Sequence, residues 1–341
     1  MRDGDLLILK SQDVASLLEG RERELMQAVR SAYEAHAAGE SSLPHSVFLR
    51  FPDGGRNRII ALPAYLGQGF NVAGLKWVSS FPNNLERGLD RASAVLILNS
   101  STTGRPEALI EGALISARRT AASAALAAEH LHGRGREVRA GLVGCGLINL
   151  EVTRFLRAVY PEARTFVAYD LDRGRAERFG RKCEEEFGGV DVRVADSLDA
   201  LLRECSLVSL ATTAVEPYIS DLSACEPGST ILHVSLRDLS PEVILAADNV
   251  VDDVDHVCRA QTSVHLAEQV VGNRDFIRCT LADILRGGAE PRTDPERISV
   301  FSPFGLGILD LAVGKLVRDL AAEREAGLVI PAFLNDSASV A

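Results

Sequence analysis

The sequence has no long apolar run, which argues against a membrane-spanning helix. Nowhere among its 341 residues does an apolar run approach the roughly 20 residues that a helix needs to cross a bilayer. The apolar run Leu6–Leu9 is much shorter than the core of a secretory signal. We therefore expect a cytoplasmic protein with no membrane partner.

The signatures of disulfide, metal and serine-hydrolase sites are also absent. The six cysteines are scattered and form no C-x-x-C pair, so we expect reduced, unpaired thiols. No set of His, Cys and carboxylate residues has the spacing of a metal site, and none is predicted. No G-x-S-x-G stretch occurs, so the nucleophile elbow of an α/β-hydrolase is not expected.

Positive charge is in the minority. The 37 Lys and Arg residues are outnumbered by 47 Asp and Glu residues, which gives a formal net charge of -10. Nucleic acids and anionic membranes would repel such a chain, so neither is an expected partner. Small acidic substrates stay open, because local arginines and lysines can bind them. The length predicts two domains or one large domain.

A glycine pair in the middle of the chain predicts a nucleotide-binding loop. Gly144-Cys145-Gly146 follows the apolar stretch 138–143 and precedes an amphipathic stretch that starts with Leu147 and Ile148. In this strand–turn–helix order the first glycine makes the tight turn, and the second lets the backbone approach a pyrophosphate. Three other G-x-G triplets in the chain lack that order.

The acidic residue expected after such a loop is present. The strand predicted over Thr165–Tyr169 ends at Asp170, whose carboxylate would bind the ribose hydroxyls and repel a 2′-phosphate. We predict NAD as the cofactor, although Arg173 and Arg175 could weaken the preference over NADP. Alternatively, Asp170 only caps the next helix. Asn149 stands where a third small residue is usual, and either displaces the helix outward or points at the phosphates.

The first part of the chain predicts an α+β unit. A helix is expected over residues 21–38, and an Ala-rich helix over about 114–131. Between them, turn-forming clusters separate short apolar stretches that we interpret as mainly antiparallel strands. The expected strands are 47–51, 58–62, 72–79, 94–98 and 108–110.

The rest of the chain predicts a Rossmann-like doubly wound parallel sheet, so the fold class is α/β. Strand and helix patterns alternate over residues 138–252, and helices follow at 261–285 and 307–324. We place an NAD-binding domain at 126–305 and a substrate-binding and dimerisation domain at 1–125. Residues 306–341 should complete the first domain, with the last helix packed on it and a loose tail at the end.

Polar residues follow two strands of the predicted parallel sheet. Thr212 and Thr213 come after SLVSLA, and Ser235 and Asp238 come after TILHV. Ligands of such sheets bind at the carboxyl ends of the strands. These residues are therefore candidates for ligand contacts, with Asp238 as a base. The stretch DLSPE is also a helix-start signal, so a structural role for Asp238 stays open.

Basic residues in the first part are candidates for proton transfer and substrate binding. Lys76 lies within VAGLKWVS, where a lysine either snorkels to solvent or faces a cleft. Arg118 and Arg119 open the Ala-rich helix. We expect one to face solvent and the other to bind a carboxylate or the cofactor phosphates. Arg50 and Arg91 are weaker candidates, which surface charge would also explain.

Together these segments resemble the ornithine cyclodeaminase/mu-crystallin family. The similar stretches lie in family order over nearly the whole chain: GLKWVSSFPNN, ISARRTAASAALAAEHL, GLVGCGLI, FVAYD, LRDLSPE and FSPFGLGILDLAVGKLV. RASAVLILN and VGCGLI look most like the branch of diaminopropionate-forming dehydrogenases in siderophore and antibiotic biosynthesis. Cyclodeaminases usually continue after the catalytic Asp with Pro-Gly-Lys. Here Asp238 is followed by Leu-Ser-Pro-Glu, which argues against ornithine cyclisation.

The resemblance implies a homodimer built through the first domain. It places Lys76 and Asp238 at the catalytic positions. The implied substrate-binding residues are Arg50, Arg91 and Arg119. The expected cofactor contacts are Arg119, Thr120, Gly144, Gly146, Leu147, Ile148, Asp170, Thr212, Thr213 and Ser235.

The implied reaction is the NAD-dependent oxidative cleavage of N-(2-amino-2-carboxyethyl)-L-glutamate to 2-oxoglutarate and L-2,3-diaminopropionate, with release of NADH. Water would add to the imine with help from Asp238 and Lys76. The alternatives are ornithine or lysine cyclodeamination and another amino-acid or imine dehydrogenation, such as that of alanine. A non-catalytic protein that binds a nicotinamide cofactor and a small ligand is a further alternative.

Overall fold

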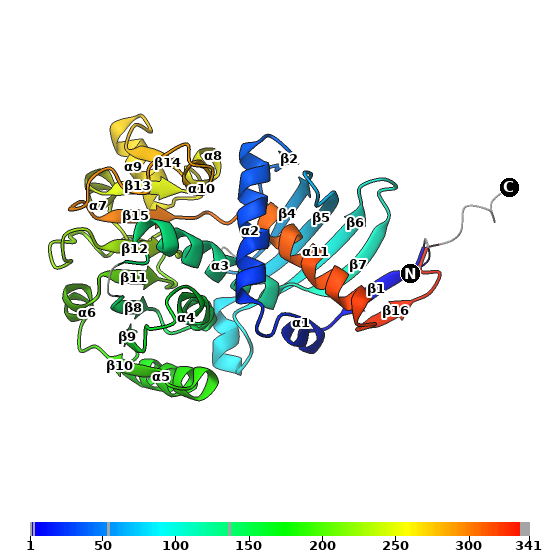
Figure 1. Cartoon of the computed structure of the whole chain (residues 1–341), viewed down its shortest axis with the longest axis horizontal. Helices are drawn as coiled ribbons and strands as arrows, with labels where there is room; N and C mark the ends of the chain where they lie inside the picture. Colours follow the sequence, from blue (N-terminus) through cyan, green and yellow to red (C-terminus); the bar gives the residue numbers. More distant parts are fainter. Residues whose placement is uncertain (1, 3, 53–54, 136–137, 335–341) are drawn as a thin grey trace. The chain divides into compact units, whose positions relative to one another are not determined.

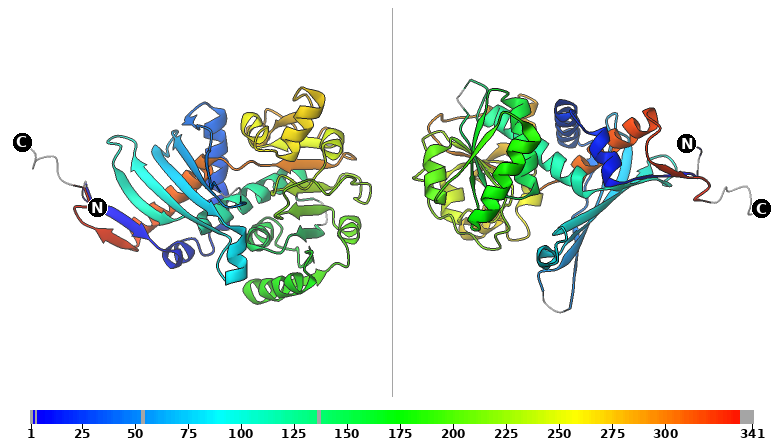
Figure 2. Two further views of the ribbon diagram at one scale, coloured as in Figure 1. Left: turned by 180° about the vertical axis from the view of Figure 1, so that it is seen from behind. Right: turned by 90° about the horizontal axis from the view of Figure 1, so that it is seen from below.

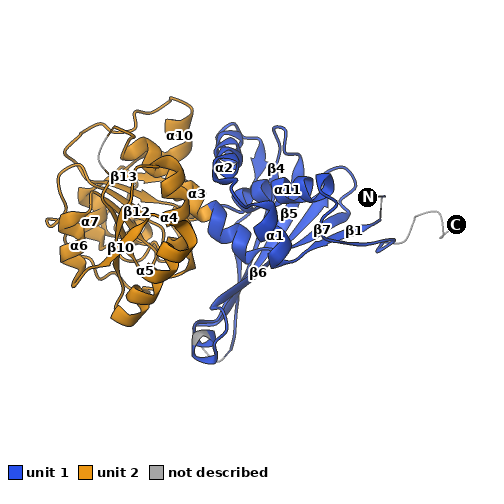
Figure 3. Cartoon of the chain, turned by 60° about the horizontal axis from the view of Figure 1, so that its bottom comes forward, with its two compact units in different colours: residues 1–119, 306–341 blue, residues 120–305 orange. Residues whose placement is uncertain are grey.

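The chain builds one unit, continues into a second and returns to the first. The computed structural model describes residue 2 and residues 4–52, 55–135 and 138–334 (Figure 1). Unit 1 comprises residues 1–119 and 306–341, and unit 2 comprises residues 120–305 (Figure 3). The helix α3 (Ala113–Leu131) crosses this division. The functions assigned to the two expected domains stay predictions, and the expected tail at 335–341 lies outside the described residues.

Unit 1 contains one mainly antiparallel sheet. Its strand order is β16 (Leu328–Ile330), β1 (Leu6–Leu9), β7 (Pro106–Glu111), β6 (Ala92–Ser100), β5 (Val72–Ser80), β4 (Arg58–Leu66) and β2 (Ser41–Ser42), with β3 (Val47–Arg50) also paired to β4. Only the β1–β7 pair among these is parallel in the described part of the chain. A short 3₁₀ helix, Pro82–Arg87, connects β5 and β6.

The two faces of this sheet have different neighbours. The helices α2 (Glu22–Ala37) and α11 (Gly307–Glu323) lie on one face (Figure 2), and α1 (Ser11–Leu17) contacts α11. α2 forms because apolar residues recur at helical spacing and become buried: Leu25, Met26, Val29 and Tyr33. The opposite face carries exposed apolar side chains, among them Trp77 and Val95. The prediction that the last helix packs on the first part of the chain is confirmed.

A glycine lets α11 approach the sheet closely. A Cβ atom at Gly314 would lie 2.2 Å from Cδ2 of Leu96 on β6, which is shorter than any real carbon–carbon contact. The missing side chain at Gly314 therefore sets the distance between helix and sheet. Polar residues that α11 directs at the sheet are buried as a result, and Asp310 is fully buried.

Unit 2 contains a doubly wound parallel sheet. The order is β10 (Asp191–Val194), β9 (Thr165–Tyr169), β8 (Ala140–Val143), β11 (Leu207–Leu210), β12 (Thr230–His233), β15 (Ser299–Ser302), β13 (Asp248–Val251) and β14 (Ile277–Thr280). Its helices are α4 (Leu147–Val159), α5 (Arg173–Phe187), α6 (Leu198–Glu204), α7 (Pro241–Ala246), α8 (Val254–Val257), α9 (Ser263–Val271) and α10 (Leu281–Leu285). The predicted α/β fold class is confirmed.

The strands of this sheet are buried on both faces. Every residue of β8, β11, β12, β13 and β15 is buried, because helices such as α4 and α6 lie on opposite sides of the strands (Figure 1). Strands covered on both sides have continuous apolar runs, whereas strands covered on one side alternate. This difference explains why the sequence patterns of the two units are distinct.

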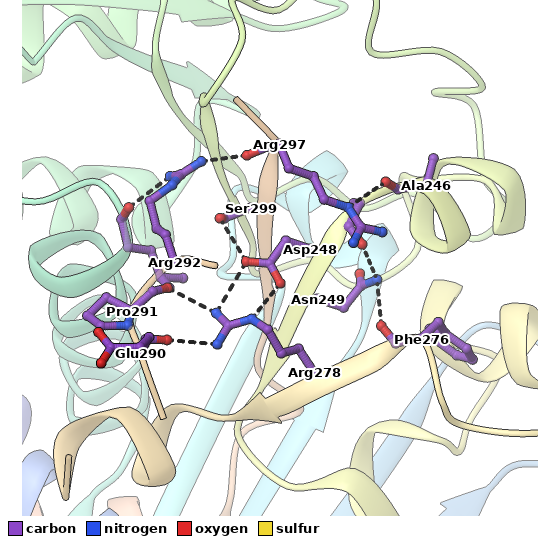
Figure 4. Close-up of polar contacts among 12 residues, drawn as sticks. Ala246, Asp248, Asn249, Phe276, Arg278, Glu290, Pro291, Arg292, Arg297 and Ser299 are labelled. Carbon is purple, nitrogen blue, oxygen red and sulfur yellow. Dashed lines mark hydrogen bonds and ion pairs between the residues drawn. The ribbon is translucent and has the colours of Figure 1, made fainter. Parts of the chain in front are cut away.

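A partly buried ion pair links neighbouring strands at one end of the parallel sheet. Arg278 of β14 binds Asp248, the first residue of β13, through Nε–Oδ1 and Nη2–Oδ2 contacts of 2.6 and 3.2 Å (Figure 4). Arg278 also donates to the carbonyls of Glu290 and Pro291, and Ser299 donates to Asp248. This cluster lies at the amino ends of the strands, the end opposite to that used by ligands. We therefore assign it a structural role.

Two sequence expectations need correction. Residues 261–285 do not form helices throughout, since 277–280 form the edge strand β14. Four residues are too short for a periodic signal, and pairing with β13 decides their conformation. The strand expected over 58–62 extends to Leu66, because β5 pairs with it along its whole length.

The structure also bears on the expectations about membrane-spanning helices, cysteines and metal sites. Within the described residues, no helix is both long and apolar enough to cross a membrane, and cytoplasmic localisation stays a prediction. The six cysteines are free thiols. In the same part of the chain, no group of three or more His, Cys, Asp or Glu side chains could hold a metal ion.

Candidate functional site

The glycine loop of unit 2 has the backbone geometry that a pyrophosphate requires. Gly144 follows β8 with φ of 88°, and a Cβ atom there would lie 2.5 Å from the carbonyl oxygen of Ala211. Gly146 is the N-cap of α4, no side chain caps this helix, and a Cβ at Gly146 would meet nothing within 4 Å. This helix N-terminus therefore has no side-chain cap and has space beside Gly146, and a helix N-terminus is a favourable place for an anion.

The loop lies where the winding of the sheet reverses. From β8 the chain adds β9 and β10 on one side, and then β11 and β12 on the other. Gly144 and Thr212 thus follow neighbouring strands, β8 and β11. Ligands of doubly wound sheets bind at such a switch point, so the position fits the predicted NAD site.

Asp170 is held beside the glycine loop. Its Oδ2 atom accepts a 2.9 Å hydrogen bond from the backbone N–H of Cys145, and its Oδ1 atom accepts from Asp172 N. Asp172, and not Asp170, caps α5 by accepting from Arg175 N. The alternative of a helix cap for Asp170 is therefore wrong. Arg175 Nε lies 3.9 Å from Asp170 and donates to the carbonyl of Cys145.

Asn149 neither points at the phosphates nor disrupts the loop. It is fully buried. Its Nδ2 atom donates to the carbonyls of Val143 and Gly144 at 2.9 and 2.8 Å, and its Oδ1 atom accepts from Ser209 of β11. Asn149 thus ties α4 to β8 and β11 through hydrogen bonds, where a small residue would achieve close packing sterically.

Asp238 is a fully buried carboxylate surrounded by donors. It accepts hydrogen bonds from the hydroxyls of Thr212 and Ser235, and its Oδ2 atom lies 3.3 Å from Nε2 of His233. Burial alone would raise the pKa of Asp238, but the hydrogen bonds and charge of His233 and the two hydroxyl donors lower it below its usual value. Asp238 is therefore ionised at neutral pH.

Asp238 follows a turn with a strained backbone conformation. Leu236 adopts φ of 68°, a left-handed conformation that is uncommon for a residue with a side chain and is often found at functional sites. His233 Nε2 also lies 3.2 Å from the backbone N of Asp238. Neutral His233 accepts from this N–H, and protonated His233 donates to the carboxylate. Ser240, which caps α7, supplies the helix start that was the alternative explanation for DLSPE.

In unit 1, Lys76 and Arg119 share one buried carboxylate. Nζ of Lys76 lies 2.7 Å from Oδ2 of Asp310, and Nε of Arg119 lies 3.1 Å from Oδ1. Ser116 Oγ accepts from both cations, at 3.2 Å from Lys76 and 3.4 Å from Arg119. Lys76 is 3% exposed, so it does not snorkel to solvent.

The charge balance of this cluster sets the protonation of Lys76. Burial lowers its pKa, Asp310 raises it and Arg119 lowers it again, with a net value of about 8. An amine with this pKa exchanges protons readily near neutral pH. Among the described residues, Nη2 of Arg119 contacts the neutral hydroxyl of Ser116, and a guanidinium fork is suited to binding a carboxylate.

The expectation that Arg118 or Arg119 faces solvent is wrong. Both are buried, because Arg118 donates to the carbonyl of Leu18 at 2.9 Å while Arg119 binds Asp310. A solvent-exposed face was inferred from neutral neighbours in sequence, but folding brings Leu18 and Asp310 of unit 1 against these two side chains.

The other predicted site residues lie in different settings. Arg50 is exposed on β3, and Arg91 donates to Ser80 Oγ at 3.1 Å. Thr213 and Leu147 are exposed, and Thr120, Ile148 and Ser235 are half-buried. Lys76, Arg50, Arg91 and Arg119 belong to unit 1, whereas Asp238 and the loop belong to unit 2. The roles of all these residues stay predictions.

Sequence reasoning missed Asp310, Ser116 and His233. Asp310 gave a usable signal, since it is the one acid in the apolar stretch FGLGILDLAVG. An acid inside such a run is buried only with a partner. Ser116 and His233 gave no signal, because a serine or histidine in an apolar element is usually explained by packing.

Comparisons of the sequence and of the fold with known proteins agree on one family. The model of the ornithine cyclodeaminase/mu-crystallin family matches residues 5–325. An alanine dehydrogenase of Archaeoglobus fulgidus is 30% identical over 96% of this chain and 99% of the relative. N-((2S)-2-amino-2-carboxyethyl)-L-glutamate dehydrogenase of Staphylococcus aureus is 26% identical over 96% of this chain and 98% of the relative. An archaeal alanine dehydrogenase dimer with bound NAD has a TM-score of 0.84 at 28% identity, covering 96% of this chain and 99% of that one.

The geometry of this cluster predicts how the pKa of Lys76 changes when Asp310 is replaced. Asp310→Asn removes the group that raises the pKa of Lys76, so this pKa should fall below about 8. NMR titration of ¹³C-labelled lysine side chains measures it. Asp319→Asn, which removes the partner of Lys315 on the same helix, is the control and should leave Lys76 unchanged. An unaltered Lys76 titration in Asp310→Asn would contradict the assigned electrostatics.

Proposed function

The chain belongs to the ornithine cyclodeaminase/mu-crystallin family, and we propose that it is an NAD-dependent dehydrogenase acting on N-(2-amino-2-carboxyethyl)-L-glutamate. The products are 2-oxoglutarate, L-2,3-diaminopropionate and NADH. Two relatives are dehydrogenases of amino acids or amino-acid conjugates, one of them of this conjugate, and the alanine dehydrogenase structure holds NAD. The class of enzyme and the cofactor follow the family, and the substrate is our proposal.

One observation carries the proposal for unit 1. The buried cluster holds an amine with a pKa of about 8, Lys76, and a guanidinium, Arg119, on the same carboxylate. Amino-acid oxidation needs a carrier for the amine proton and an anchor for the α-carboxylate. Lys76 and Arg119 supply these two groups, with Asp310 fixing both.

The proposed reaction removes a hydride from the glutamate α-carbon, and bound NAD supplies the acceptor. Neutral Lys76 takes one proton from the protonated secondary amine, so that loss of the hydride from the α-carbon leaves a cationic imine. Arg119 binds the α-carboxylate and holds the reacting carbon in place. Water then adds to the imine carbon, the carbon–nitrogen bond breaks, and diaminopropionate leaves with the proton that its nitrogen regains.

Asp238 acts on the water in this proposal. Its lowered pKa keeps it anionic, so it stabilises the cationic imine and accepts a proton as water adds. His233 lies beside Oδ2 and stabilises the carboxylate between these steps. Thr212 and Ser235 fix the orientation of Asp238 through their hydroxyls.

We also propose a homodimer formed through unit 1. The sheet face that α2 and α11 leave uncovered carries five large apolar residues with 37% to 64% exposure: Val47, Leu49, Tyr65, Trp77 and Val95. Contiguous exposed apolar surface of this kind is typical of an interface. The archaeal alanine dehydrogenase is itself a dimer.

The first test compares substrates. Purified enzyme with NAD receives the conjugate, L-ornithine and L-alanine separately, and NADH absorbance and organic products are measured. We expect NADH and 2-oxoglutarate in equal amounts from the conjugate alone. Proline and ammonia from ornithine without net NADH would identify a cyclodeaminase. NADH and pyruvate from alanine would favour the second candidate, which the 30% identity to an alanine dehydrogenase supports.

The second test follows Lys76. If its neutral form takes the proton, kcat/KM rises with pH through about 8 and then levels off. Lys76→Met should lower kcat by roughly 10²–10⁴-fold and remove this rise, while NADH binding, followed by fluorescence, is retained. Arg23→Met on α2, an exposed residue, is the control. An unchanged pH profile in Lys76→Met would exclude this role.

The third test concerns cofactor choice. Asp170→Ser removes the carboxylate that repels a 2′-phosphate, so the kcat/KM ratio of NAD to NADP should fall by roughly 10–100-fold. Asp172→Ser removes an equal charge from the neighbouring helix cap and should leave the ratio within about threefold. Equal ratios in the Asp170 variant and the unmodified enzyme would remove Asp170 from the cofactor site.

A further inference from the structure

A pair of arginines faces each other on the sheet of unit 1. Arg50 of β3 is the cross-strand partner of Arg58 of β4, and Arg58 is the partner of Ser80 on β5. Like charges directly opposite each other destabilise a sheet. Within the described residues, neither Arg50 nor Arg58 lies within ion-pair distance of a carboxylate. Arg50 lies over the ring of Phe48, with its Cζ atom 5.9 Å from the ring centroid, but no carboxylate of the described residues compensates the repulsion.

Arg58 also has a hydrogen-bond donor without an acceptor. It is half-buried, and its Nε atom is buried without a hydrogen-bond acceptor among the described residues. Burial and the charge of Arg50 both lower its pKa. A buried donor without an acceptor is costly, and an anion placed between two guanidinium groups removes both costs. Arg91, bound to Ser80 Oγ, brings a third guanidinium to the same row.

This row lies on the same sheet face as Lys76. Residues two or four apart on a strand share a face. Leu62, the partner of Lys76, is four residues from Arg58 along β4, which corresponds to about 13 Å. The arginine row and the Lys76–Asp310–Arg119 cluster therefore occupy one face, separated along the strands.

We propose that Arg50 and Arg58 bind a second, distal carboxylate of the substrate, so that the substrate class is an extended polycarboxylate amino acid. This inference rests on the proposed function and defines its specificity. Alanine or proline, with one carboxylate, leaves the pair unoccupied. The glutamate conjugate has three carboxylates, one of which Arg119 binds at the reacting end, and the long arginine side chains bring the pair within reach of another.

The test removes each partner of the contact separately. The substrates are the conjugate and its γ-amide, N-(2-amino-2-carboxyethyl)-L-glutamine, and the variant is Arg58→Met. We expect the unmodified enzyme to prefer the conjugate by at least about tenfold in kcat/KM. Arg58→Met should raise KM for the conjugate by roughly 10–100-fold with a small effect on kcat, and should change the amide kinetics by less than about threefold.

A matched control separates this contact from general charge and folding effects. Arg56→Met removes the same charge from an exposed residue of the same hairpin and should leave the preference unchanged. Because Arg50 and Arg58 repel each other, Arg58→Met should not lower the thermal unfolding midpoint. Equal losses for both substrates, or none for either, would overturn the proposal while the dehydrogenase function stands.

A binding measurement tests the pair even if the conjugate is not a substrate. Calorimetry with NAD present compares glutarate with butyrate, a monocarboxylate of similar length. We expect glutarate to bind more tightly to the unmodified protein, and Arg58→Met to remove the difference while Arg56→Met retains it. Equal binding of the two acids to the unmodified protein would overturn the distal carboxylate site, whatever the reaction proves to be.

Discussion

The buried carboxylate of Asp310 is the group on which the chemistry of unit 1 depends. It compensates two cations at once, Lys76 and Arg119, at 2.7 and 3.1 Å. Without it, both charges would be buried and unpaired, which costs roughly 3–5 kcal/mol for a broken buried pair. Asp310 lies 234 positions after Lys76. The return of the chain from unit 2 to unit 1 is therefore required for the site, as well as for the core.

The environments of Lys76 and Asp238 both lower the pKa, but by different physical causes. Lys76 loses affinity for its proton because burial and Arg119 outweigh Asp310. Asp238 stays ionised because His233 and two hydroxyls outweigh burial. At neutral pH these shifts leave an anionic carboxylate on Asp238 and an amine on Lys76 that can exchange its proton. The pKa of each group is set by neighbouring residues of its own unit.

Period-two alternation gives the sheet of unit 1 two chemically different faces. One face carries the basic side chains of Lys76, Arg58 and Arg50. The other face carries the exposed apolar side chains of Trp77 and Val95. A shift of one residue in register would exchange these faces. The long pairing of β4, β5 and β6 therefore keeps each set of side chains on its own face.

Short-range patterns in the sequence were sufficient to predict much of the fold. The strand–turn–helix around Gly144, the carboxylate of Asp170 at a strand end and the alternation of the parallel unit are short-range patterns, and the predicted fold class is confirmed. Other features depend on distant partners: the burial of Lys76 against Asp310, the anchoring of Asn149 to Ser209, the donors around Asp238, and the pairing of Arg50 with Arg58. Periodicity reports which way a side chain points, but burial and charge compensation depend on the residue that folding places opposite it.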